Sequence, residues 1–271
     1  MIAETVLRAR VQQSEPRSKS AGSQLLAKGL HLLRHIAHRG SGDVGVRDLA
    51  RELEWTTTAT HRLLVTLLNE GFLEQHPVSL KYRIGYDAFQ IGAAYLRSSG
   101  IDTVAPPILR SLVDEHGLNA FLGVMREHEL VYLLAMQCQN SVALRVAPGS
   151  TAPLHKTAMG KIILADQPDE VVLEKLKLSV ESDTAGYSFR TKDFLAELAT
   201  ARKNGFATVN EEFLPGLFSV GAAVRDFSGR VVAAISVSRS KQGLAPREIQ
   251  IIAGVVTEAA DRLSRGLGFF A

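Results

Sequence analysis

The sequence contains a single cysteine, Cys138. One cysteine excludes an internal disulfide framework and any zinc site built from several thiolates. No apolar run approaches the roughly 18–20 residues that a membrane span requires. The first twenty residues also lack the continuous apolar stretch of a signal peptide. These absences predict a cytoplasmic protein that does not enter a membrane.

Positive charge is concentrated in the first part of the chain. The net charge of the 271 residues is only +3, but residues 1–100 hold 13 Lys and Arg against 9 Asp and Glu, whereas residues 101–271 hold 18 against 19. Five of the eight histidines also lie in the first hundred residues. A basic excess at one end is expected where that end meets nucleic-acid phosphates. The length allows one large domain or two ordinary ones.

The first 85 residues predict a mobile tail followed by a winged helix-turn-helix. Residues 1–22 mix charged and polar residues without a sustained period, which is typical of a disordered tail. Ser23 is a plausible N-cap, and the residues after it recur at helical spacing (Leu26, Leu30, Leu33 and Ala37). Helices are also expected over 46–53 and 57–70, with Gly71 ending the latter. The segments 72–75 and 82–84 predict a short β-hairpin, so the domain is expected over 23–85.

The helix expected over 57–70 has two different faces. Leucines occupy one face, and the opposite face carries Thr57, Thr58, His61 and Arg62 in its first turns. A recognition helix needs this combination, because its polar face enters the major groove while its apolar face packs on the domain. Arg62 can contact guanine or a phosphate, and Arg83 in the hairpin can reach a backbone phosphate. The alternative is a winged helix that serves only protein interaction.

The remaining residues predict a linker helix and an α+β domain. We expect the linker helix over 86–100 and the domain over 101–271. Pro106 and Pro107 are expected to open a helix that ends near Gly117. Strands and helices alternate irregularly around hairpins, which favours an antiparallel sheet with flanking helices. Strands are expected at 121–125, 130–136, 142–146, 207–210, 220–225 and 231–237, and helices at 158–165, 170–177, 192–204 and 246–266.

Two stretches of this second domain suggest a ligand site. Thr157 can cap a helix that starts at Ala158, which would leave the amides of Ala158, Met159 and Gly160 facing outward as a site for a carboxylate. An ordinary capped helix is the alternative. In the last strand, Ala234, Ser236 and Ser238 share one face. A row of hydroxyls fits the wall of a polar-ligand pocket, or else a solvent-exposed sheet face.

The chain resembles the IclR family of transcriptional regulators from about Leu25 to Gly268. Residues 57–67 read Thr-Thr-Ala-Thr-His-Arg-Leu-Leu-Val-Thr-Leu, where the family has Lys-Ser-Thr-Val-His/Tyr-Arg-Leu-Leu-x-Thr-Leu. The family's Tyr-Arg-Leu-Gly appears as Tyr-Arg-Ile-Gly at 82–85. Further family motifs match Pro-Leu-His-Lys-Thr-Ala-Met-Gly-Lys at 153–161, the Glu-Glu segment at 205–216 and the strand ending at Ser238.

The resemblance implies a DNA-binding regulator with a GAF-like effector domain. Ligand contacts carried over by position fall on the amides of Ala158 and Met159 and on Ser219, Ser236 and Ser238. A small organic or aromatic acid is the implied effector, and a palindromic duplex operator is the implied partner of a homodimer or tetramer, acting as repressor or activator. Val209 stands where the family often has Asp, which favours a more apolar acid than a two- or three-carbon keto acid.

An enzyme is the main alternative from another functional class. It would require a nucleophile such as Cys138 beside a base such as His155. The sequence has no nucleophile elbow, Gly-rich phosphate loop or metal-spaced cluster. Glu211 and Glu212 are adjacent, so in an extended segment they point in opposite directions and make a poor acid/base pair. We therefore expect no catalytic residues, no metal and no cofactor. A metabolite-binding protein that uses the winged helix only for protein contacts is the remaining alternative.

Overall fold

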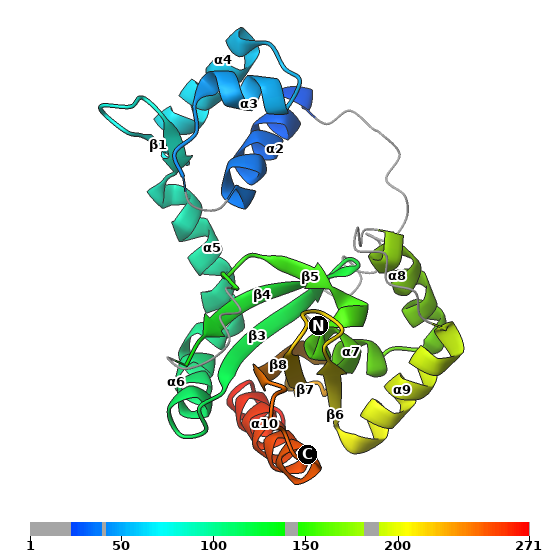
Figure 1. Ribbon diagram of the computed structural model, residues 1–271. Coiled ribbons are helices and arrows are strands. Elements are labelled where there is room, and N and C mark those ends of the chain that lie inside the picture. Colours follow the sequence, from blue (N-terminus) through cyan, green and yellow to red (C-terminus); the bar gives the residue numbers. More distant parts are fainter. Residues whose placement is uncertain (1–22, 40–41, 139–145, 182–189, 271) are drawn as a thin grey trace. The chain divides into compact units, whose positions relative to one another are not determined.

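The computed structural model describes residues 23–39, 42–138, 146–181 and 190–270 (Figure 1). The tail expected over 1–22 and nearly all of the strand expected over 142–146 lie outside these residues. The chain divides into two compact units, and the boundary between Tyr95 and Leu96 falls within helix α5 (Tyr86–Ser99). None of the described helices is long and apolar enough to cross a bilayer.

The first unit is a winged helix-turn-helix, as the sequence predicted. Its elements are α2 (Gln24–His38), α3 (Val46–Glu52), α4 (Thr57–Asn69), β1 (Leu73–Gln75) and β2 (Tyr82–Ile84). Ser23 caps α2 by accepting from the Leu26 amide at 3.3 Å. Gly71 has a φ of +73°, the left-handed conformation that ends a helix. Strands β1 and β2 pair antiparallel, and the core of the unit includes Leu32, Leu49 and Leu64.

The buried face of α2 differs from the stripe seen in the sequence. Leu26 is 62% exposed and Leu30 is 48% exposed, whereas Leu32 and Ile36 are buried. The reason is that α2 carries more apolar residues than one face can bury against α4. Periodicity alone therefore offered two candidate faces, and packing selected one of them. Leucine side chains remain on the surface of α2 as a result.

An ion-pair group joins the ends of α2 and α3. The Glu52 carboxylate accepts a hydrogen bond from Arg39 and lies 2.8 Å from Nε2 of His35. The hydrogen bond from Arg39, followed by the contact with His35, lowers the pKa of Glu52 from 4.5 to about 2. The carboxylate is therefore held in its charged form well into the acid range.

The second unit is built on a six-stranded antiparallel sheet in the order β5-β4-β3-β8-β7-β6. Helices α6 and α10 pack on one face, and α7 packs on the other, followed outward by α9 (Figure 1). Each face has its own apolar cluster. The α+β class is therefore confirmed. The bounds are α6 (Ile101–Asp114), β3 (Asn119–Arg126), β4 (Glu129–Met136), β5 (Thr151–Pro153), α7 (Ala158–Ala165), α8 (Asp169–Glu181), α9 (Thr191–Asn204), β6 (Phe206–Asn210), β7 (Leu217–Arg225), β8 (Val231–Ser240) and α10 (Pro246–Gly266).

Two local predictions for this unit were wrong or incomplete. Helix α6 begins at Ile101, directly after the left-handed Gly100, so Pro106 and Pro107 lie inside it and do not open it. Its buried stripe, which starts at Ile101, continues past both prolines, and this burial offsets the backbone hydrogen bonds that they remove. Strand β5 was not predicted. It pairs with β4 at the edge of the sheet, where a proline is tolerated.

Candidate nucleic-acid interface and ligand site

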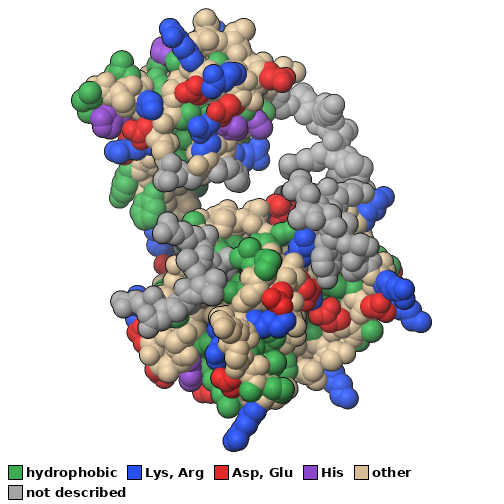
Figure 2. Space-filling view, in the orientation of Figure 1, with side chains coloured by type: hydrophobic (Ala, Val, Ile, Leu, Met, Phe, Trp, Pro, Cys, Tyr) green, Lys and Arg blue, Asp and Glu red, His purple; other side chains and the backbone are tan. Residues whose placement is uncertain are grey.

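The four recognition-helix residues named from the sequence lie together on the exposed side of α4. Thr57, Thr58, His61 and Arg62 are all exposed, whereas Leu63 and Leu64 on the opposite side are buried. The start of the helix is fixed by Thr56, whose hydroxyl accepts from the Ala59 amide at 3.3 Å. Figure 2 shows Lys, Arg and His side chains on the surface of the unit that contains α2, α3 and α4. The arrangement offers donors to a groove without disturbing the core.

The two arginines named from the sequence differ in their surroundings. Arg62 has no carboxylate at ion-pair distance among the residues that the structure describes. Arg83, in contrast, donates from Nε and from a terminal nitrogen to Oε2 of Glu74, at 3.0 and 2.8 Å. Glu74 is the residue directly opposite Arg83 in the β1–β2 register. A phosphate contact by Arg83 would therefore have to replace an existing ion pair.

Arg47 is a candidate contact that the sequence interpretation missed. It lies in the first turn of α3, is exposed and has no ion-pair partner among the described residues. In helix-turn-helix proteins the helix that precedes the recognition helix crosses the DNA backbone. The position of Arg47 in the helix predicted over 46–53, directly before the expected recognition helix, was the sequence signal that could have identified it.

The N-terminus of α7 forms the first wall of the candidate ligand site. Thr157 caps the helix as predicted, with its hydroxyl accepting from the Gly160 amide at 3.0 Å. The prediction that the Gly160 amide is left for a ligand is therefore wrong. Ala158 and Met159 are buried, so their amides do not face solvent as we expected. The cause is strand β7, where Gly221 lets the backbone approach so closely that a Cβ would lie 2.7 Å from the Ala158 carbonyl carbon.

The second wall is a row of polar residues on the α7 face of the sheet. Ser238 on β8 lies directly opposite Ser219 on β7 and Asn119 on β3, and residues paired in this way share a face. Ser236 and Ser238 are 5% and 2% exposed, so the alternative of a solvent-exposed serine face is wrong. The Ser238 hydroxyl has no hydrogen-bond partner among the described residues. A buried hydroxyl of this kind is costly unless something binds it.

Asn119 was not singled out from the sequence. It is fully buried, and its Oδ1 accepts from the Cys138 amide at 3.1 Å. Val209, which stands where the IclR pattern often has Asp, is buried opposite Ser219. Only the strand order, which places β3 beside β8, brings Asn119 into the serine row. Sequence spacing carried no signal for this neighbour.

A cavity of about 540 Å³ opens on the same face of the sheet, at the end of β4. Its lining includes Ala135, which lies opposite Phe121, and Phe121 lies opposite Ser236. The cavity and the serines are therefore neighbours across two strands. The cavity is wide open to solvent, so it borders the serine row without enclosing a ligand by itself. The other lining residues are Gln137, Val146 and Ala147.

The two adjacent glutamates point to different partners, as predicted. Glu211 accepts from the Gly216 amide at 2.8 Å and pairs with Lys241. The hydrogen bond from Lys241, followed by that from the Gly216 amide, lowers the pKa of Glu211. Glu212 pairs with the buried Lys161. The two carboxylates are thus engaged separately and do not form an acid/base pair.

Comparison with known proteins matches both units to family models. Residues 25–77 match the IclR helix-turn-helix domain, and residues 93–265 match the bacterial transcriptional regulator IclR C-terminal domain. The transcriptional repressor IclR of Escherichia coli (strain K12) is 29% identical, over 90% of this chain and 90% of its own length. The transcriptional repressor AllR of Klebsiella pneumoniae is 30% identical, over 96% of each chain.

Solved structures give the same assignment. The IclR protein of Thermotoga maritima is 27% identical and superposes with a TM-score of 0.73, over 92% of this chain and 100% of that one. An IclR homologue from Microbacterium hydrocarbonoxydans, solved in complex with 4-hydroxybenzoate, shares the fold with a TM-score of 0.77 at 19% identity, over 90% of this chain and 99% of that one. The named relatives are regulators, not enzymes. The chain therefore belongs to the IclR family of bacterial transcriptional regulators, with a helix-turn-helix DNA-binding part and a C-terminal effector-binding domain.

Proposed function

We propose that this regulator binds a palindromic operator through α4 and that a small organic acid in the second unit modulates its operator affinity. The proposed DNA-binding domain spans 23–85, the linker helix 86–100 and the effector domain 101–271, and the proposed location is the cytoplasm. The observation that carries the proposal is the exposed group Thr57, Thr58, His61 and Arg62, backed by buried leucines. These side chains supply the donors that read base edges or grip phosphates.

A homodimer, or a dimer of dimers, is the proposed assembly. One recognition helix reads too few base pairs for useful specificity, and two copies on half-sites one helical turn apart solve this. Exposed apolar side chains on α5 and α2 support pairing between copies, because water-exposed aromatic and aliphatic groups are stabilised when a partner covers them. These side chains are Leu25, Leu26, Leu30, Tyr86, Phe89, Ile91 and Tyr95.

The proposed effector is an acid with an apolar body. Its carboxylate would bind the Ala158 and Met159 amides at the start of α7, where the helix dipole favours negative charge. A polar group elsewhere on the ligand would bind the hydroxyls of Ser219, Ser236 and Ser238. Val209 contributes only apolar surface beside Ser219, which favours an aromatic or aliphatic acid over a short keto acid. The neighbour solved with 4-hydroxybenzoate, a carboxylate and a hydroxyl joined by a ring, supports this chemistry.

Two measurements test the proposal. Fluorescence anisotropy with duplex fragments from the protein's own promoter should show tight binding that weakens steeply with salt, because phosphate contacts release counterions. Thermal shift with glyoxylate, pyruvate and 4-hydroxybenzoate should give the largest stabilisation with the aromatic acid. Shifts confined to glyoxylate or pyruvate would reject the apolar-acid assignment. Failure to bind duplex DNA at low ionic strength, with or without these acids, would reject the regulator mechanism in favour of a protein-interaction module.

A further inference from the structure

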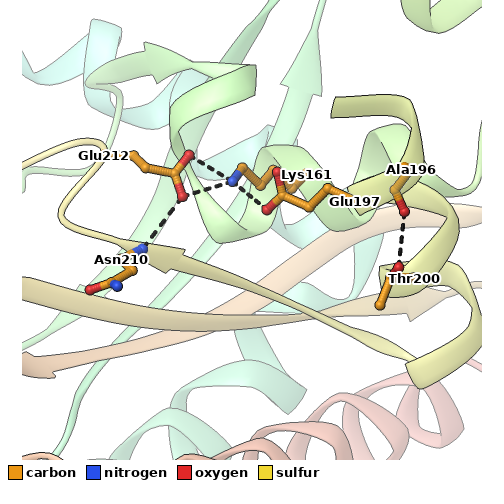
Figure 3. Close-up of polar contacts among 6 residues, drawn as sticks. All are labelled: Lys161, Ala196, Glu197, Thr200, Asn210 and Glu212. Carbon is orange, nitrogen blue, oxygen red and sulfur yellow. Dashed lines mark hydrogen bonds and ion pairs between the residues drawn. The ribbon is translucent and has the colours of Figure 1, made fainter. Parts of the chain in front are cut away.

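A buried lysine joins three elements of the effector domain. Lys161 in α7 has a side chain that is 1% exposed. Its Nζ donates to Oε1 of Glu197 in α9 at 2.6 Å and to both carboxylate oxygens of Glu212, at 2.9 and 2.7 Å (Figure 3). A buried ammonium group is tolerated only with such compensation. The two carboxylates are 42% and 22% exposed, so they remain partly solvated.

These contacts occupy the donors of Lys161, so its ammonium group is not available to a ligand. An ammonium group has three donors, and here the acceptors are three carboxylate oxygens. The ring of Phe194 lies 5.9 Å from Nζ on a further side. A ligand carboxylate would have to displace one of the glutamates. The lysine therefore acts on its protein neighbours and not directly on an effector.

The Lys161–Glu212 pair links the two walls of the candidate ligand site. Lys161 lies one helical turn after Ala158, whose amide belongs to the first wall. Glu212 is the second residue after the end of β6 and the third after Val209, which lies opposite Ser219 of the second wall. The loop between β6 and β7 is also closed on itself, because Glu211 accepts from the Gly216 amide. The ion pair thus fixes a closed loop to the start of α7.

We propose that Lys161 and Glu212 are positioning residues that set the distance between the α7 amides and the β6–β7 hairpin, and so set effector affinity. Neither residue touches the effector. The effect on effector affinity rests on the proposed function. The restraint of the β6–β7 loop concerns the ligand-free protein and can be tested alone. A pair of this kind, with partners from segments 51 residues apart, restrains the loop more than local hydrogen bonds can.

The first test is amide hydrogen exchange of the full-length, ligand-free protein. Lys161→Met keeps the chain length of the side chain and removes its charge. Because this leaves Glu212 without its cation, the double variant Lys161→Met/Glu212→Gln removes both charges and guards against misfolding. Lys175→Met, which removes a half-buried lysine bonded to the Glu127 carbonyl, is the matched control.

In both Lys161 variants we expect exchange at the Glu211 and Gly216 amides to become about tenfold faster, because the loop loses its ion pair with α7. Exchange in α10 and in the control variant should be unchanged. Exchange that is unchanged in the loop, or that rises equally throughout the domain, would overturn the proposal.

The second test measures the dissociation constant of 4-hydroxybenzoate by calorimetry, together with operator affinity in the absence of ligand. We expect Lys161→Met to weaken binding of the acid about tenfold, Glu212→Gln to have a smaller effect because an amide oxygen still accepts from Nζ, and operator affinity to stay unchanged. A purely structural role would alter operator binding and acid binding together. If Lys161→Met binds the acid as the unaltered protein does, the positioning role is wrong. If the unaltered protein binds none of the tested acids, the proposed effector class fails, and the exchange experiment still decides the role of the pair.

Discussion

Replacing Arg62 by alanine should weaken operator binding without weakening the fold. The side chain is exposed and has no ion-pair partner among the described residues, so its removal breaks no intramolecular charge contact. Exposed substitutions of this kind change the free energy of unfolding by about 0.5 kcal/mol or less. The neighbouring Leu63 and Leu64, which anchor α4, are untouched. A loss of DNA affinity can then be assigned to the contact itself.

The expected loss of operator affinity depends on how many copies of α4 contact the operator. An arginine contact to a base edge is worth about 1–3 kcal/mol of discrimination. Two copies of α4 on a palindromic operator double this to about 2–6 kcal/mol. Since 1.4 kcal/mol is a factor of ten, even the lower bound corresponds to about a thirtyfold increase in the dissociation constant. If Arg62 instead contacts a phosphate, the slope of log affinity against log salt concentration should decrease in magnitude by about one for each bound copy of α4.

The assay is fluorescence anisotropy of a labelled operator duplex over a series of salt concentrations, with a duplex of scrambled sequence for comparison. Arg247→Ala is the matched control, because Arg247 is an exposed arginine of α10 in the other unit. A guanine contact predicts lost preference for the operator at an unchanged salt slope, and a phosphate contact predicts a reduced slope on both duplexes. A change of less than about threefold, with the control equally affected, would refute the assignment of α4 as the reading helix.

Three other predictions follow from contacts in the structure. Glu74→Gln removes the ion-pair partner of Arg83 and should free this arginine for a phosphate. In the anisotropy assay we expect operator affinity to rise by about 0.5–1 kcal/mol and the slope of affinity against salt to become steeper. Unchanged binding would mean that Arg83 does not reach DNA. The pKa of Glu52 is lowered from 4.5 to about 2, so its stabilising contribution is present above pH 4.5 and is lost as the pH falls toward 2. In urea titrations Glu52→Gln should therefore be less stable than the unaltered protein at pH 7 and should lose less stability over that pH window, and parallel pH curves would contradict this. Gly221→Ala places a Cβ 2.7 Å from the Ala158 carbonyl carbon and should cost about 1–3 kcal/mol of unfolding free energy, whereas Gly254→Ala in α10, with no atom within 4 Å of the new Cβ, should be neutral or stabilising by up to about 1 kcal/mol. Equal effects of the two glycine substitutions in thermal unfolding would refute the close approach of β7 to α7.

Local signals in the sequence were sufficient for most elements and for the exposed polar face of α4. Capping residues such as Ser23 and Thr157, and the left-handed Gly71, act on their own helix ends, so they can be interpreted without knowing the rest of the fold. The four candidate DNA contacts between Thr57 and Arg62 lie on a single helix, so their common exposed face follows from helical periodicity alone. The position of α4 and the exposure of its polar face were therefore predictable.

The tertiary structure decided everything that depends on which elements become neighbours. Packing against α4 determined which face of α2 is buried. In α6, the buried apolar residues stabilise the helix even though Pro106 and Pro107 lie inside it. The sheet order placed Asn119 beside Ser238, and the backbone of β7 at Gly221 packs closely against the start of α7. Lys161 met Glu212 across 51 residues. Sequence periodicity describes one helix or strand at a time. A candidate ligand site and a buried ion pair form between elements, so the residues that meet there are determined only by how the elements pack around a common core.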